Sequence, residues 1–310
     1  MKYLSAQPDQ PYFLWQLKVQ ISNFASLGIE EDLIILLATE GEPSADAQHL
    51  KAHTSAQVHF IPDTRADRSY APSVQFFLYS RFFETHKIGQ PYMLVDSDVI
   101  LMRPLKVDHL LADDIVYMSD TRSYLGFEYL MSKGEEQLAT MARMVGIGPG
   151  DVWVNDDGAG GAQTIMKGHE TPTFWKKVEA DALMLYKYMT IREPLWQGDG
   201  YPIQRWTAGM WAFLWNLWLS GAKTVCAPEL AFCWGSDPVY TKQRARILHL
   251  AGVTSEMRET HFYKGDYMNK SPLDMDILQL QHLTQNPLNM SQVYLFEVLL
   301  AKDHWDKCSS

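Results

Sequence analysis

The chain of 310 residues is long enough for one sizeable core, or for one domain with a large annex. Apolar residues make up 46% and charged residues 21%, which is the composition of an ordinary globular protein. The formal net charge of -10 argues against a non-specific nucleic-acid binder, because the phosphate backbone would be repelled rather than attracted.

The three cysteines form no disulfide framework and match no zinc pattern, which is compatible with a reducing compartment. The first eight residues lack the apolar core of a signal peptide. No run reaches the roughly 20 apolar residues of a membrane helix, and the closest candidate, 211–219, is short and interrupted by Asn216. We therefore expect a soluble, cytoplasmic protein without a membrane span.

The first hundred residues alternate between patterns typical of buried strands and of helices. Apolar runs predict strands at 2–6, 33–38, 58–61 and 92–95, and helical spacing predicts helices at 12–27 and 74–85. This alternation argues for an α/β structure with a mostly parallel central sheet flanked by helices. Ligands of such sheets collect at the carboxyl ends of the strands.

Later segments predict further elements of the same fold. A strand is expected at 115–119, loops at 146–151 and 156–161, a short element at 162–166, and helices at 173–188, 207–219, 272–284 and 291–304. We predict one domain over 1–270, with a first half of about 1–120 and a second half of about 121–270. Residues 271–310 would form a C-terminal helical extension packed on it.

Two carboxylates, Asp96 and Asp98, follow directly on the apolar run 92–95. Burial of paired carboxylates is costly unless they meet a cation. We therefore place them at a strand end, where their oxygens could hold Mn²⁺ or Mg²⁺ against substrate phosphates. The alternative is a strand-edge turn whose two aspartates are merely solvated.

With Tyr79-Ser80-Arg81 on the preceding helix, the Asp96-Ser97-Asp98 element resembles the D-x-D signature of nucleotide-sugar glycosyltransferases of the GT-A fold. The resemblance is clearest over 74–105. It implies a transfer of sugar from a nucleotide donor, most often a UDP-sugar, to a hydroxyl acceptor. It further implies that the two aspartates hold the metal ion, that Arg81 touches the donor, and that Tyr3, Ser5 and Gln7 lie beside base and ribose. The domain over 1–270 would then be catalytic, with a nucleotide-binding half of about 1–120 and an acceptor half of about 121–270.

The same family usually adds a histidine ligand near the end of the fold. His249, followed by Gly252, resembles the His-x-x-Gly element of glycogenin-like relatives, in which a diphosphate-binding lysine comes soon after. Here the next lysine is Lys264, after a longer gap than in those relatives. His261 is a rival ligand, and a buried structural histidine is the alternative for His249.

The acceptor side offers fewer signals. The glycine-rich segment 155–163 resembles a cleft-lining loop of this fold, in which glycines let a sugar approach the backbone; the alternative is a flexible surface turn. Asp157 in this segment is a candidate catalytic carboxylate, and Asp199 is another. The Trp-rich segment from Trp206 is weakly similar to plant peptidyl-serine galactosyltransferases and hydroxyproline arabinosyltransferases, but Gly209 stands where those proteins carry Glu. Core packing is expected for most of these tryptophans, and Trp234 is an alternative platform for a sugar.

We therefore expect a metal-dependent glycosyltransferase, with a saccharide or a hydroxyl-bearing peptide or glycan as acceptor. A sugar nucleotidyltransferase is the first alternative, although 5–9 lacks the glycine-rich basic loop that such enzymes carry. A non-catalytic carbohydrate-binding protein of the same fold is the second. Donor sugar, stereochemical outcome and catalytic base do not follow from the sequence.

Overall fold

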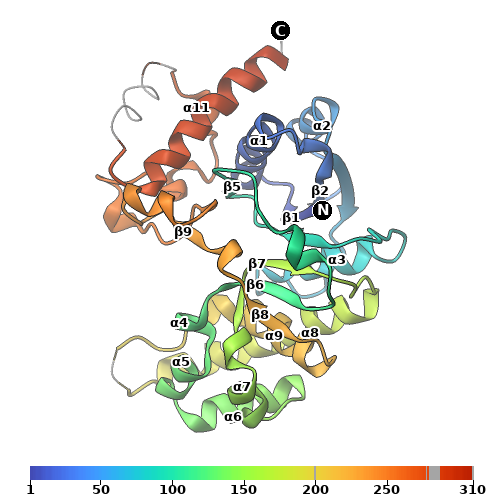
Figure 1. Ribbon diagram of the computed structural model, residues 1–310, viewed down its shortest axis with the longest axis vertical. Helices are drawn as coiled ribbons and strands as arrows, with labels where there is room; N and C mark the ends of the chain where they lie inside the picture. The colour runs from blue at the N-terminus through green and yellow to red at the C-terminus, as the bar shows by residue number, and fades with distance from the viewer. Residues whose placement is uncertain (199, 277, 279–286, 309–310) are drawn as a thin grey trace. The chain divides into compact units, whose positions relative to one another are not determined.

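The computed structural model describes residues 1–198, 200–276, 278 and 287–308 (Figure 1). The chain divides into two compact units that alternate along the sequence. The β1–β3 unit consists of Lys2–Pro62, Val95–Val107 and the residues from Glu229 onward, and the β6–β8 unit consists of Asp63–Leu94 and Asp108–Pro228 with Met1. The expected functional halves near 1–120 and 121–270 stay a prediction.

The β1–β3 unit is built on three parallel strands in the order β3-β2-β1: β1 (Lys2–Pro8), β2 (Leu33–Thr39) and β3 (Gln57–Pro62). Every residue of β2 is buried, because this middle strand is a continuous apolar run with a neighbour on each side. The strands predicted at 2–6, 33–38 and 58–61 are therefore confirmed.

Three helices accompany these strands: α1 (Pro11–Ser26), α2 (Ala45–Ala52) and α11 (Met290–Cys308). The last helix, drawn in red, packs beside α1 (Figure 1). Trp305 fixes this contact, since its indole N–H donates to the backbone oxygen of Lys18 at 3.0 Å. The predicted C-terminal helical addition is thus present for 290–308, whereas most of the helix expected at 272–284 lies outside the described residues.

A second, small sheet completes the same unit. It has the order β5-β10-β9 and consists of β5 (Val99–Leu101), β10 (Ile247–His249) and β9 (Phe232–Trp234). Strand β10 runs antiparallel to β5 and parallel to β9. This sheet pairs β5, which follows the Asp-Ser-Asp element, with β10, which lies about 150 residues later in the chain.

In the β6–β8 unit the strand order is β4-β7-β6-β8. Strand β7 is antiparallel to both of its neighbours, and β8 is parallel to β6. The bounds are β4 (Tyr92–Leu94), β6 (Val116–Asp120), β7 (Gly160–Met166) and β8 (Thr224–Cys226). With the parallel strands β1–β3, the expected α/β class with a mostly parallel sheet and flanking helices is confirmed.

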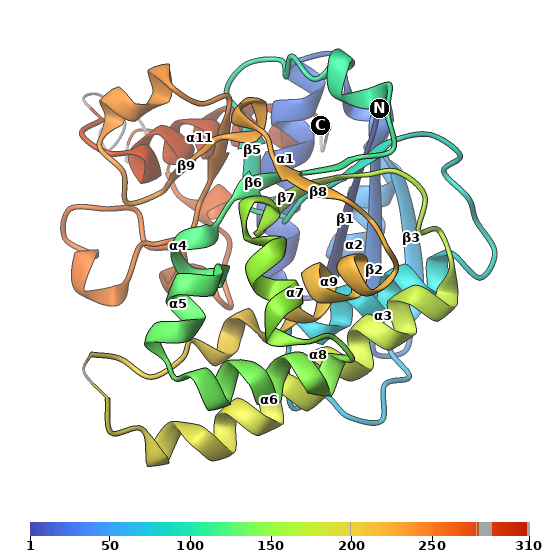
Figure 2. The same ribbon diagram turned by 60° about the horizontal axis from the view of Figure 1, so that its bottom comes forward.

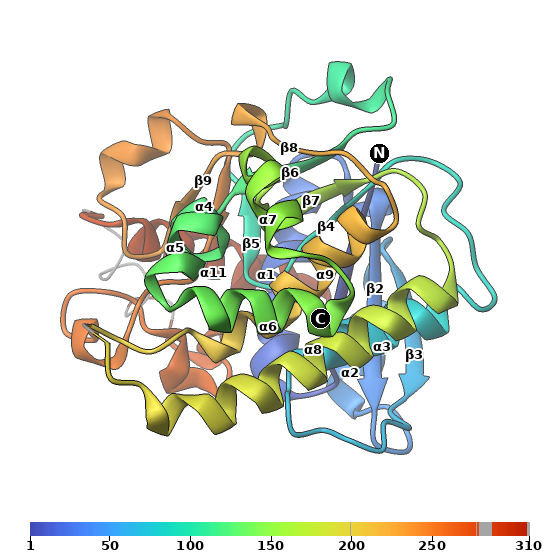
Figure 3. The same ribbon diagram turned by 90° about the horizontal axis from the view of Figure 1, so that it is seen from below.

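The helices of this unit pack on one another and, through α9, on β7. Figure 2 shows α9 beside the long helix α8, and Figure 3 shows α6 alongside α8. Their bounds are α3 (Ser73–Phe82), α4 (Arg122–Leu125), α5 (Phe127–Ser132), α6 (Glu135–Val145), α7 (Pro149–Val154), α8 (Pro172–Arg192) and α9 (Ala208–Leu219).

The loop expected at 146–151 is wrong in its second half, where α7 begins at Pro149. Proline is well suited to the first helical turn, because it needs no hydrogen-bond partner for its nitrogen. The Asp151 carboxylate then accepts from the backbone N–H of Gly148 at 2.7 Å. The expected core role of the tryptophans is confirmed for Trp211 and Trp215, which are fully buried in α9.

No helix among the described residues is long and apolar enough to cross a membrane.

Candidate metal and donor site

Asp96 and Asp98 lie in a tight turn between β4 and β5. The turn is closed by a hydrogen bond from the Val99 N–H to the Asp96 carbonyl oxygen at 3.2 Å. At its start, the Val95 N–H donates to the oxygen of Leu4 in β1 at 3.1 Å. The two carboxylates thus follow the end of an apolar strand, as the sequence predicts.

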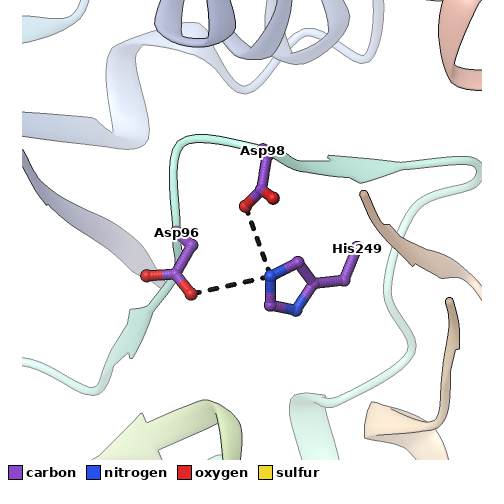
Figure 4. Close-up of side chains that lie close together, drawn as sticks. All are labelled: Asp96, Asp98 and His249. Carbon is purple, nitrogen blue, oxygen red and sulfur yellow. Dashed lines mark ion pairs between the residues drawn. The ribbon is translucent and has the colours of Figure 1, made fainter. Parts of the chain in front are cut away.

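His249 reaches this turn through the small sheet. Strand β10 places His249 opposite Val99, and the next residue, Leu250, donates its N–H to the Asp98 oxygen at 3.0 Å. The His249 Nε2 atom lies 3.3 Å from a carboxylate oxygen of Asp98 and 3.6 Å from one of Asp96 (Figure 4). Register in the sheet therefore brings together residues about 150 positions apart.

Lys264 adds a positively charged side chain to the cluster. Its ammonium group pairs with Asp98 on the carboxylate oxygen that does not face His249. The Asp98 side chain is only 5% exposed, whereas that of Asp96 is 37% exposed. Asp98 is thus the buried anchor of the cluster, and Asp96 is its solvent-facing carboxylate.

The electrostatics of the cluster follow from these pairs. Burial by itself would raise the pKa of Asp98, but the charges of Lys264 and His249 outweigh it and hold the pKa well below its usual value. Burial likewise opposes the charged forms of His249 and Lys264, yet Asp98 raises the pKa of both. The two carboxylates and the ammonium leave one net negative charge when the imidazole is neutral.

The donor set fits a divalent cation. Asp96, Asp98 and His249 each offer one ligand atom, and these atoms lie within 4.8 Å of one another. Bonds of about 2.1 Å in octahedral geometry put neighbouring ligand atoms about 3 Å apart, close to the observed contacts of 3.3 and 3.6 Å. The three ligand atoms would leave coordination positions for phosphate or water, and carboxylate oxygens are ligands that Mn²⁺ and Mg²⁺ accept.

Trp234 and the turns that follow β9 and β10 form the surroundings of His249. The Trp234 ring is nearly parallel to the imidazole, at 15° and a centroid distance of 6.1 Å. Gly235 donates its N–H to the oxygens of His249 and Ala251 at 3.1 and 2.9 Å. Gly252 has a φ of +80°, and an added Cβ would lie 2.9 Å from the Ser236 hydroxyl, so the turn after β10 requires glycine. Trp234 therefore packs beside the candidate ligand.

The structure groups His249, rather than its rival His261, with the two aspartates. The expected donor residues Tyr3, Ser5 and Gln7 lie on β1 in the same unit and are all buried. Burial raises the pKa of Tyr3 to about 12, and its ring packs edge-on against Phe24. Their contact with base and ribose stays a prediction.

Two other candidates, Arg81 and Asp157, belong to the β6–β8 unit. Arg81 is partly exposed on α3 and pairs with Glu84 at 3.0 Å. The Asp157 carboxylate is fully exposed, with Arg122 at 3.6 Å. Asp199 lies outside the described residues. The roles expected for Arg81, Asp157 and Asp199 stay predictions.

Sequence reasoning missed a set of buried amides on α1. Gln16 and Gln20 hydrogen-bond the Asp-Ser-Asp turn, and Asn23 hydrogen-bonds the strand after it. Their spacing of four and then three residues puts them on one helix face, and this was the available signal. A polar helix face normally faces solvent, so the pattern alone did not identify them.

No family model matches the chain, and no curated protein sequence matches it. Several solved structures similar to it are glycosyltransferases. The galactosyltransferase LgtC, in complex with donor and acceptor sugar analogs, is 13% identical with a TM-score of 0.43, over 81% of this chain and 87% of that chain. WbbM, a bifunctional glycosyltransferase, is 10% identical with a TM-score of 0.47, over 100% and 52%.

A third similar structure is the glycosyltransferase GlyE of Streptococcus pneumoniae TIGR4. It is 9% identical with a TM-score of 0.46, over 99% of this chain and 64% of that chain. At these identities and scores, the function has to be argued from the residues of the chain itself.

Proposed function

We propose that the protein is a metal-dependent glycosyltransferase that moves a sugar from a nucleotide-sugar donor, with UDP-sugars as the first candidates, to a hydroxyl acceptor. One observation carries the proposal: Asp96, Asp98 and His249 converge within the distance that one divalent cation can span. The cluster lies at the end of an apolar strand and carries the D-x-D spacing that resembles the GT-A signature.

The charge of the site supports this assignment. Cleavage of a sugar–phosphate bond leaves negative charge on a nucleoside diphosphate, and a bound cation stabilises that charge as it develops. Asp96, Asp98 and His249 would hold the ion. The Lys264 ammonium, next to Asp98, is a second positive charge available to a phosphate oxygen.

The remaining roles are assigned by the resemblance. Arg81 would contact donor sugar or phosphate, and Tyr3, Ser5 and Gln7 would lie along the nucleoside. Asp157 and Asp199 are the candidate carboxylates beside the transferred sugar, of which an inverting enzyme needs one as a base and a retaining enzyme needs none.

The direct test incubates the purified protein with a panel of UDP-, GDP- and CMP-sugars, with and without Mn²⁺, and measures release of the nucleotide. We expect release from one donor, with Mn²⁺ required and an excess of chelator abolishing it. Addition of saccharide acceptors should raise the rate and yield a glycosylated product. Asp96→Asn, which removes an exposed ligand charge, serves as the matched inactive control.

Two results would contradict the proposal. Exchange of pyrophosphate into a nucleotide sugar would identify a nucleotidyltransferase instead. If the protein binds a saccharide but turns over no donor of the panel, it is a carbohydrate-binding protein instead.

A further inference from the structure

The side chain of Gln20 hydrogen-bonds both ends of the turn that carries the two aspartates. The Gln20 amide nitrogen donates to the Asp96 oxygen at 2.8 Å and to the Val99 oxygen at 2.9 Å. These carbonyls belong to the first and last residues of the turn, which is closed by the bond between Val99 N–H and Asp96 oxygen. One side chain of α1 therefore hydrogen-bonds the backbone at both ends of the Asp-Ser-Asp element.

The two inner residues of the turn are fixed as well. The Ser97 hydroxyl donates at 2.8 Å to Gln16, one helical turn before Gln20 on the same face of α1. The Asp98 carbonyl oxygen accepts from the N–H of Leu250, the residue after β10, at 3.0 Å. The backbone of the turn is thus held between α1 and the strand that delivers His249.

The amide orientation of Gln20 follows from its partners. Carbonyl oxygens only accept, so the NH₂ group must face both of them. The Gln20 amide oxygen is consequently buried, and it has no hydrogen-bond partner within the described chain. Gln20 is fully buried. Burial of a polar atom without a hydrogen-bond partner costs free energy of folding. Its placement is explained by the two bonds that the nitrogen makes to the turn.

We propose that Gln20 is a positioning residue that sets the affinity of the site for its divalent cation. It touches no ligand atom, but it holds the backbone from which the Asp96 and Asp98 carboxylates project. Carboxylates fixed before the ion arrives lose little freedom on binding, whereas a loosened turn must be ordered at that moment. This inference rests on the proposed metal site of the glycosyltransferase.

The test measures Mn²⁺ affinity of the full chain, by titration followed through the EPR signal of free Mn²⁺. Gln20→Leu keeps the approximate volume and removes both hydrogen bonds to the turn. We expect the dissociation constant for Mn²⁺ to rise about 10-fold or more, as it does when residues that orient metal ligands are lost. Gln20→Asn, with a shorter amide that cannot reach both carbonyls, should weaken binding by an intermediate factor.

The matched control is Asn216→Leu in the β6–β8 unit. Asn216 is a buried amide whose nitrogen also donates two hydrogen bonds, to Asp181 at 2.7 Å and to the Ala212 oxygen at 2.8 Å. Its replacement should lower the melting temperature, as in the Gln20 variants, yet leave Mn²⁺ affinity unchanged. Loss of affinity only in the Gln20 variants therefore separates positioning of the ligands from general destabilisation.

The outcomes are distinguishable from failure of the proposed function. If wild type binds Mn²⁺, Asp96→Asn does not, and both Gln20 variants bind like wild type, the positioning role is wrong and the metal site stands. Equal weakening in Asn216→Leu would likewise overturn it. If wild type itself binds no Mn²⁺ or other divalent cation, both the metal site and the role of Gln20 fall. Should Gln20→Leu not fold, the Gln20→Asn titration decides.

Discussion

The two aspartates of the site share one proposed function but stand in different surroundings. Asp98 is almost fully buried, and each of its carboxylate oxygens faces a cationic or potentially cationic group, Lys264 or His249. Asp96 is more than one third exposed, and its carboxylate lies 3.6 Å from the Nε2 atom of His249. A change of charge at the two positions should therefore affect metal binding alike and stability unequally.

We expect Asp96→Asn to lose Mn²⁺ binding while its melting temperature without metal stays near that of wild type. Asp98→Asn should lose Mn²⁺ binding and also be destabilised by roughly 1–3 kcal/mol, because Lys264 and His249 then lack their buried counter-charge. Thermal unfolding with excess chelator measures the stability, and Mn²⁺ titration measures the binding. Equal melting temperatures of the two variants would contradict the anchoring role of Asp98.

In the glycine-rich segment 155–163, packing within the protein explains the glycines. Its glycines were expected to let a sugar approach the backbone. In the structure, a Cβ on Gly158 would lie 2.3 Å from the Thr224 oxygen, and one on Gly160 would lie 2.4 Å from the Ser119 oxygen. The close approach that these glycines permit is that of neighbouring strands of their own unit.

Gly158→Ala should consequently destabilise the protein by about 1–3 kcal/mol, since the clash is with backbone and cannot be relieved by a side-chain rotation. Gly150→Ala is the matched control within the same unit. It lies inside α7, where an added Cβ meets nothing within 4 Å, and alanine is the better helix former by about 1 kcal/mol. Denaturant unfolding should show opposite signs for the two variants; unchanged stability of Gly158→Ala would contradict this packing.

The sequence indicated the burial of only one face of helix α1. The helix expected at 12–27 is present, and its apolar residues Leu14, Leu17 and Ile21 are buried. The polar face is buried too, because the turn, β5 and α11 cover it. There Asn23 pairs with the backbone of Leu101 in β5 and donates to Glu297 of α11 at 3.2 Å.

This arrangement predicts a pH effect at Glu297. Burial raises the pKa of Glu297, although the hydrogen bond from Asn23 partly offsets it. A carboxyl whose pKa is higher in the folded than in the unfolded chain favours folding at acid pH, and this contribution is lost as pH rises through the folded pKa. For this reason the wild type loses stability as the pH rises from the unfolded value of about 4.3 through the higher folded pKa of Glu297.

Glu297→Gln keeps the shape and the acceptor for Asn23 but cannot ionise. We expect its melting temperature, relative to that of wild type, to increase from about pH 4.5 to about pH 7.5, because only the wild type ionises there. Thermal scans of both proteins over this range provide the measurement. A difference that is constant or that decreases with pH would show that the Glu297 carboxylate is stabilised rather than disfavoured.

For the whole molecule, long apolar runs were sufficient to predict strands such as β2 and helices such as α9, because burial dominates both. The Asp96–Asp98 pair stood out because carboxylates rarely follow such a run. The pairing of His249 with them depends on the register of β10 against β5, and the choice against His261 could not be made from spacing. The alternation of the chain between two units also lacks a local signal, since it arises from contacts distant in sequence.

The division into units yields a prediction about the whole chain. All members of the metal cluster found among the described residues belong to the β1–β3 unit. A ligand that binds only the folded form stabilises by mass action, by about 2.7 kcal/mol at a hundredfold excess over its dissociation constant. Mn²⁺ alone should therefore slow hydrogen exchange first in the segments that carry or hold the ligands, 12–24, 95–101 and 247–252. Peptides from α6 and α8 should exchange unchanged, and Asp96→Asn should show no protection by Mn²⁺ anywhere. Protection confined to the β6–β8 unit would place the ion elsewhere and contradict the assignment of these three ligands.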